Sequence, residues 1–180
     1  MLFRHAKLIL NIKSKIQMKL YTPNPMTPCC GVIRAVADFV GQKITVQVVD
    51  EAFRKTPEFK LMNSTDTFPI LETAEGCLQE SSAIVKYLCQ LSNKGLGTNA
   101  TERSLIDQWF AYTNTTIRGN LNTVLTGIFG TGEVTQAAWN EAAKNLKAHC
   151  KVLNTALEGK TYLASNEVTC ADILLACALM

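Results

Sequence analysis

The stretch "STDTFPILETAEGCLQESSAIVKYL", residues 64–88, decides the fold because it joins two short apolar runs to an amphipathic helix. A proline, Pro69, stands in the first run, although proline cannot donate a hydrogen bond to a sheet ladder. The turn signal Glu75-Gly76 separates the two runs, and apolar residues recur at helical spacing after Glu80-Ser81. The stretch therefore predicts a β-hairpin followed by a helix, with Pro69 at a position that needs an explanation.

The residues before this hairpin predict a strand, a helix, a second strand and a short helix. Residues 19–22 and the β-branched run 44–50 are the strands, and residues 29–40 have helical spacing that stops at Gly41. Thr56, directly before a proline, is suited to cap a short helix. A βαβ half followed by a ββα half is the thioredoxin-like arrangement, which we assign to residues 18–92.

After a polar linker, residues 93–100, the strand signals end and helical signals take over through residues 101–180. A threonine-, asparagine- and glycine-rich segment is expected to bend or break the first helix near its middle. A further helix is predicted to begin at Thr169, with Asp172 completing a capping box. The final residues run on apolar to Met180, so we expect the sequence to end inside an incomplete all-helical domain. The predicted fold class is thus α/β plus all-α.

The charge of the chain argues against nucleic-acid binding, and its cysteine content argues for reduced thiols. The chain has 18 basic and 15 acidic residues, and four of the basic ones precede Met18, which leaves 14 basic against 15 acidic in the body. Such a neutral body lacks the basic surface that direct nucleic-acid binding requires. Seven cysteines, an odd number without C-x-x-C spacing, indicate reduced and mostly buried thiols. Those expected in apolar surroundings are Cys77, Cys89, Cys150, Cys170 and Cys177.

The first 17 residues are basic, free of acidic residues and partly apolar, which is the composition of a mitochondrial transit peptide. We favour instead an upstream start codon or an extension, with Met18 beginning the domain and the protein cytoplasmic. No run approaches the ~20 apolar residues of a membrane span. The two histidines, His5 and His149, lie far apart without a cysteine or carboxylate cluster, so no metal site is expected.

Two pairs of residues are candidates for ligand binding. In thioredoxin-like domains the proline before the hairpin is usually cis, which would let Phe68, preceding Pro69, pair with an extended peptide ligand. At the next helix, the amides and the Ser81 hydroxyl suit a carboxylate, and Glu80 suits an amino group. Together they fit an amino-acid or γ-glutamyl head group, although Glu80 and Ser81 also fit an ordinary helix start.

These motifs resemble those of the glutathione transferase superfamily. The segment F-P-I-L, followed after eight residues by E-S-S-A-I, is similar to its glutathione-binding segment, and V-T-C-A-D-I is similar to the capping box of its helical domain. The similarity is greatest to the transferase-like N-terminal domain of the gamma subunit of eukaryotic translation elongation factor 1, from the order and spacing of the Thr56, Glu80, Trp109 and Thr169 motifs. The resemblance covers residues 18–180 and implies glutathione as the ligand of Phe68, Pro69, Glu80 and Ser81.

The same resemblance implies that a serine or cysteine near the end of the first strand activates the thiol. In this sequence that position holds Met26, whose thioether cannot donate a hydrogen bond. Thr27 and Tyr21, with Thr22, are the possible substitutes. A basic residue that often contacts glutathione ahead of the proline is replaced by Asp66-Thr67.

Three functions follow from the resemblance. The first is a non-catalytic scaffold of the elongation factor 1 gamma type, which would bind the beta-type exchange-factor subunits and form a homodimer. The second is an active glutathione transferase that conjugates glutathione to electrophiles. The third is a tethering domain in an aminoacyl-tRNA synthetase complex.

Overall fold

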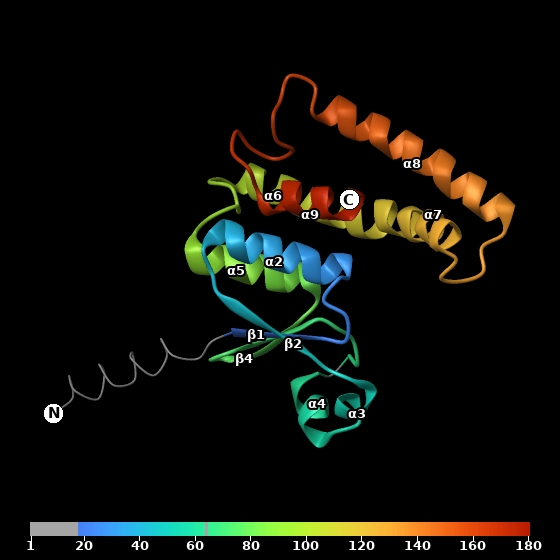
Figure 1. Ribbon diagram of the computed structural model, residues 1–180. Helices are drawn as coiled ribbons and strands as arrows, with labels where there is room; N and C mark the ends of the chain where they lie inside the picture. Colours follow the sequence, from blue (N-terminus) through green and yellow to red (C-terminus); the bar gives the residue numbers. More distant parts are fainter. Residues whose placement is uncertain (1–17, 64) are drawn as a thin grey trace. The chain divides into compact units, whose positions relative to one another are not determined.

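The computed structural model describes residues 18–63 and 65–180, which fall into two compact units divided between Ser92 and Asn93. The predicted basic extension, residues 1–17, lies outside the described residues. Figure 1 shows the helices and strands of both units.

The first unit contains a four-stranded mixed sheet. Its strands are β1 (Met18–Thr22), β2 (Ile44–Val48), β3 (Ile70–Thr73) and β4 (Gly76–Gln79), in the order β2-β1-β3-β4. β1 and β2 are parallel, whereas β3 is antiparallel to both β1 and β4. A parallel pair needs a crossover connection and an antiparallel pair can be joined by a hairpin, so the predicted βαβ and ββα halves are confirmed.

Helices cover both faces of this sheet. α2 (Pro28–Val40) and α5 (Ser81–Ser92) lie side by side on one face, and the short helices α3 (Glu51–Arg54) and α4 (Pro57–Met62) lie on the other (Figure 1). α2 ends at Gly41, whose φ of +73° is the left-handed conformation that glycine adopts readily. The predicted cap of α4 is confirmed because the Thr56 hydroxyl accepts the Phe59 N–H.

Two groups of side chains form the core of the first unit. Leu20 and Leu71 are fully buried, as are apolar residues of α2 and α5 such as Val36 and Leu88. A second cluster joins Tyr21, Phe59 and Ile70, with Phe53 and Phe68 packed against it. This second cluster fixes α3 and α4 close to the start of β3.

The second unit is entirely helical over its described residues. Its elements are α6 (Ala100–Ala111), the π-helix η1 (Tyr112–Ile117), α7 (Arg118–Phe129), α8 (Gln136–Ala156) and α9 (Cys170–Leu179). α6 packs on α9, and α7 packs on α8. The threonine-rich segment, which was predicted to bend or break the first helix, forms the π-helix η1 and so interrupts the regular α-helix between α6 and α7. Within η1 the Thr115 hydroxyl donates to the Ala111 carbonyl at 2.8 Å, which competes with the regular backbone hydrogen bonds.

α9 begins with the predicted capping box of Thr169 and Asp172, which is confirmed. One expectation for the second unit is wrong. Cys150 is exposed rather than buried. Gly127 lies within α7, and Gly130 ends that helix.

Candidate functional site

One edge of the sheet gathers the three segments that carry the candidate residues. Tyr21 of β1 pairs with Ile70, the first residue of β3, and Ile70 pairs in turn with Gln79, the last residue of β4. The loop after β1, the Phe68-Pro69 pair before β3 and the Glu80-Ser81 pair after β4 therefore leave the sheet at the same edge. Strand register thus brings together residues that are up to 60 positions apart.

The N-termini of α2 and α5 open at this edge as well. α2 begins six residues after β1 ends, and α5 begins two residues after β4 ends. The two helices pack against each other along the sheet. Because unpaired N–H groups give each helix N-terminus a partial positive charge, this edge is suited to a carboxylate group.

Phe68 and Pro69 directly precede β3, and Phe68 contacts α4. The Phe68–Pro69 peptide bond is cis, as predicted. Pro69 is buried, and the half-buried Phe68 ring packs against Phe59 at a centroid distance of 5.3 Å. The segment is therefore held by the aromatic cluster beneath it.

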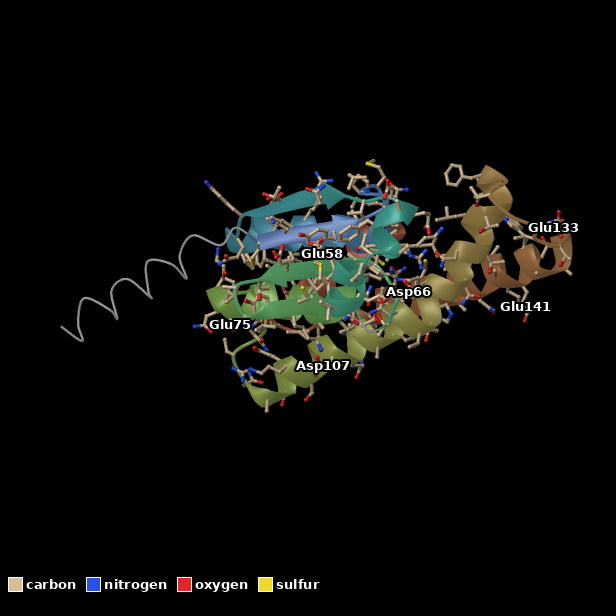
Figure 2. The ribbon with its side chains drawn as sticks, turned by 90° about the horizontal axis from the view of Figure 1, so that it is seen from below. Glu58, Asp66, Glu75, Asp107, Glu133 and Glu141 are labelled. Atoms are coloured by element: carbon tan, nitrogen blue, oxygen red, sulfur yellow. The ribbon has the colours of Figure 1, made fainter. Side chains whose placement is uncertain are left out.

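Arg54 supplies a positive charge beside this segment. Its guanidinium donates to Glu51 Oε1 and to Asp66 Oδ2, both at 3.1 Å, and lies 6.0 Å from the centroid of the Phe68 ring. The hydrogen bond that Arg54 donates to Glu51, followed by the one that it donates to Asp66, raises the pKa of Arg54. Asp66, labelled in Figure 2, thus holds a cation at the place where the sequence lacked a basic residue. Sequence reasoning missed Arg54 because it comes from a four-residue helix and reaches the site across twelve positions.

A polar network ties the approach to β3 to the end of β4. The buried Asn63 accepts the Thr65 N–H at 3.0 Å, and the Thr65 hydroxyl lies 2.9 Å from Gln79 Oε1. Gln79 Nε2 in turn donates to the Met62 carbonyl at 3.2 Å. These bonds fix the position of Gln79, directly before Glu80.

Glu80 has an unusual backbone conformation. Its φ of +68° is left-handed, which is uncommon for a residue other than glycine, and its side chain is exposed. The Glu80 carbonyl accepts the Ile84 N–H at 3.0 Å and so begins α5, with the half-buried Ser81 in its first turn. Residues in sparsely populated backbone conformations are frequent at binding sites, which makes Glu80 a candidate on structural grounds too.

The loop after β1 presents Met26 to solvent. Its side chain is 83% exposed, while its backbone N–H donates to Asn24 Oδ1 at 2.9 Å. The buried Thr22 hydroxyl donates to the Asn24 carbonyl at 3.0 Å. Thr27 caps α2, its hydroxyl oxygen accepting the Cys30 N–H at 3.4 Å, and a hydroxyl in this role retains a hydrogen to donate.

Tyr21, the other hydroxyl candidate, bonds within the sheet. Its phenol donates to Glu72 Oε2 at 2.8 Å, and its ring stacks on Phe53 at 5.8 Å. Burial, reinforced by Glu72, raises the pKa of Tyr21 to about 12. The phenol therefore stays protonated near neutral pH, with its hydrogen engaged by Glu72.

Comparison with known proteins identifies this arrangement. Residues 24–96 match the family model for the glutathione S-transferase N-terminal domain, and residues 108–180 match the model for the C-terminal domain. The chain belongs to the glutathione transferase superfamily. The glutathione transferase fold accordingly accounts for the thioredoxin-like sheet and the helical unit together, and the predicted fold class is confirmed.

Individual members of the superfamily differ in how much of their length the chain covers. Elongation factor 1-gamma 3 of rice is 34% identical over 79% of the chain, which corresponds to 35% of that protein. Glutathione S-transferase D7 of Drosophila melanogaster is 29% identical over 84% of the chain and 69% of that protein. The chain thus spans about a third of the elongation factor relative.

The fold agrees closely with solved glutathione transferases. Glutathione S-transferase I from maize, in complex with an atrazine glutathione conjugate, gives a TM-score of 0.81 at 24% identity, covering 91% of this chain and 80% of that one.

In the described part of this chain, no helix is both long and apolar enough to cross a membrane. Nor do His, Cys, Asp and Glu side chains of residues 18–63 and 65–180 form a group of three that could hold a metal ion.

Proposed function

We propose that the chain is the transferase-like region of an elongation factor 1 gamma type protein and serves as a non-catalytic assembly module. In this role it binds beta-type exchange-factor subunits, forms a homodimer and supports protein synthesis in the cytoplasm. The rice elongation factor relative supports the proposal by its 34% identity over most of the chain.

The observation that carries the proposal is the state of the side chains between β1 and α2. Transferases of this superfamily need a hydroxyl or thiol there to stabilise the glutathione thiolate. Here Met26 offers a thioether, the Tyr21 phenol donates to Glu72, and the Thr22 hydroxyl donates to the Asn24 carbonyl. Three of the four available groups therefore have no hydrogen to give to a thiolate.

A second candidate function is an active glutathione transferase, which Thr27 favours. Its hydroxyl accepts the Cys30 N–H at 3.4 Å, and this contact leaves the hydroxyl hydrogen to be donated to a bound thiol. In either case, we infer that glutathione can be held at this edge by Phe68, Pro69, Glu80 and Ser81. Arg54 lies beside Phe68, and a glutathione carboxylate would compete with Glu51 and Asp66 for its guanidinium.

Co-sedimentation of the full chain with a purified beta-type exchange-factor subunit tests the proposed role. A stoichiometric complex that persists when glutathione is added is expected. Titration calorimetry with glutathione, performed in parallel on the chain and on Arg54→Gln, measures the inferred ligand site separately. Failure to form the complex, combined with micromolar glutathione binding, would instead support the enzyme.

A further inference from the structure

The tip of the α7–α8 hairpin carries a tryptophan held in a fixed position. Trp139, in the first turns of α8, donates from its indole Nε1 to the Val124 carbonyl of α7 at 3.2 Å. The ring also packs directly on Gly127, where an added Cβ would lie only 2.5 Å from Trp139 Cδ1. The glycine in the middle of this helix is therefore explained by the space that the indole needs.

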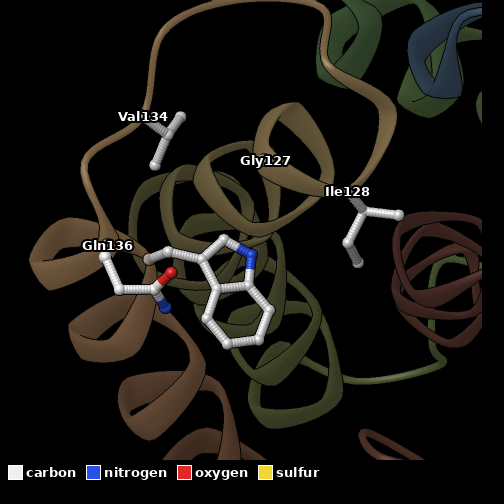
Figure 3. Close-up of a pocket in the computed structure, with 5 residues that line it drawn as sticks. Gly127, Ile128, Val134 and Gln136 are labelled. Carbon is white, nitrogen blue, oxygen red and sulfur yellow. The ribbon is translucent and has the colours of Figure 1, made fainter.

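A hollow of about 330 Å³ opens beside this indole. It is lined by Gly127 and Ile128 of α7, Val134 of the connection, and Gln136 and Trp139 of α8. Figure 3 shows Val134 and Gln136 together on one side, with Ile128 across the α7 turn that carries Gly127. The volume is at the lower end for ligand pockets, so it fits one large side chain better than an extended small molecule.

The surface next to the hollow is apolar and exposed. Ile128 is 60% exposed and Phe129, the last residue of α7, is 71% exposed. A pre-positioned tryptophan near exposed apolar side chains is typical of the anchoring points of protein interfaces.

The charge of the hairpin tip indicates what kind of partner fits. Between residues 119 and 143 the only charged residues are Glu133 and Glu141, and lysine and arginine are absent. Glu133 directly precedes Val134, which lines the hollow. The last turn of α7 has no basic residue either, so its carbonyl end adds partial negative charge. The tip is therefore complementary to a cationic partner.

We propose that this hollow is a docking site for a segment of a partner protein that presents one large apolar side chain beside a lysine or arginine. The apolar side chain enters between Ile128 and Val134 and contacts the Trp139 ring, while the cation pairs with Glu133. The site lies in the helical unit and uses none of the residues of the candidate glutathione site, so it stands independently of the proposed function.

A pair of synthetic peptides tests the proposal on the full chain. The first is a capped hexapeptide with two central leucines flanked by lysines, and the second replaces every lysine by glutamate. The lysine peptide is expected to change the tryptophan emission saturably and in a salt-dependent manner. The glutamate peptide is expected to bind at least tenfold more weakly. Trp139→Phe removes the emission change, which separates Trp139 from the buried Trp109.

Two glycines of the same helix provide a matched control. Gly127→Ala pushes the indole into the hollow and is expected to weaken lysine-peptide binding at least tenfold. Gly119→Ala, whose added Cβ meets nothing within 4 Å, is expected to leave binding unchanged. Glu133→Lys, an exposed change in the connection that should not disturb folding, is expected to abolish the preference for the lysine peptide.

Several results would overturn the proposal. These are equal binding of the two peptides, equal effects of the two glycine variants, or an unchanged preference in Glu133→Lys. Binding only to anionic lipid vesicles, or self-association of the chain that Phe129→Ser abolishes, would also refute it, because the occupant would then be a membrane or a second copy.

Discussion

Replacing Asp172 by alanine should destabilise the helical unit. The loss should be larger than for alanine substitution of any other partly exposed aspartate or glutamate in this unit. The Asp172 carboxylate accepts the Thr169 N–H and the Thr169 hydroxyl, both at 2.8 Å, and the Leu163 N–H at 2.9 Å. Thr169 and Leu163 are 1% and 4% exposed, so water cannot readily replace the lost acceptor. One side chain thus fixes both the start of α9 and the loop that precedes it.

The magnitude follows from these three bonds. A buried donor left without its acceptor costs about 1 to 3 kcal/mol, and loss of a helix cap alone costs about 1 kcal/mol. Since the hydroxyl can rotate toward another acceptor, the two amides dominate, and we expect a loss of about 3 kcal/mol in the free energy of unfolding. For a chain of this size that corresponds to a fall of roughly 6 to 12 °C in Tm.

Urea denaturation followed by circular dichroism measures the effect on the full chain. Glu141→Ala, an exposed change on α8, is the control and should alter the free energy of unfolding by less than about 0.5 kcal/mol. A loss below about 1 kcal/mol for Asp172→Ala would refute the reasoning that the Leu163 and Thr169 amides depend on this carboxylate.

Three further predictions concern local features. The raised pKa of Tyr21, about 12, means that the neutral phenol stabilises the fold fully below pH 10 and that this contribution is lost as pH rises from 10 to 12. Tyr21→Phe should therefore be less stable by about 1 kcal/mol at pH 8 and should lack this alkaline loss. Equal pH profiles of the two proteins in thermal melts would contradict the effect of burial and of the Glu72 contact on the phenol. Glu80→Gly should leave the free energy of unfolding unchanged or raise it, because glycine adopts the left-handed φ at this position without strain. Ala83→Gly, at an exposed position of α5, should lower the free energy of unfolding by about 1 kcal/mol in urea denaturation. The reverse order of the two variants would be evidence against the left-handed backbone at Glu80. Gly97→Ala should lower Tm because φ is +71° and the added Cβ would lie 2.6 Å from a neighbouring side chain, and an unchanged Tm would show that this turn can adjust.

Most of the local structure could be predicted because its signals are local. Thr56, Gly41 and the pair Thr169 and Asp172 each act within four residues, so their helix ends could be located from the sequence. The hairpin likewise follows from two apolar runs around a short turn. Where a residue within a few positions fixes the backbone conformation, the sequence is sufficient to predict the local structure.

The candidate site was harder to predict because it is formed by contacts between residues that are distant in sequence. The register that aligns Tyr21, Ile70 and Gln79 could be expected from the fold, but the bond between Arg54 and Asp66 could not, because α3 has only four residues and no periodic pattern. In the same way, composition could not show that the Tyr21 hydroxyl is engaged by Glu72. Side-chain pairing across strands and helices is decided by packing, which a single sequence does not display.

The π-helix and the exposed Cys150 have similar explanations. Threonine hydroxyls compete for helix carbonyls, but whether they break a helix or widen it depends on the packing of neighbouring elements. An apolar neighbourhood in sequence also differs from burial, because Cys150 is exposed although Leu153, three residues later in the same helix, is buried.

The rate of glutathione conjugation is the most direct test of the central claim that this transferase-like chain is not catalytic. The assay follows a chloronitrobenzene electrophile with saturating glutathione, using the full chain and the variant Thr27→Ala. The account predicts a rate no higher than that of buffer for both proteins, even if calorimetry shows that glutathione binds. Robust turnover by the chain that Thr27→Ala abolishes would contradict it, since Thr27 would then supply the hydrogen bond that Met26 cannot.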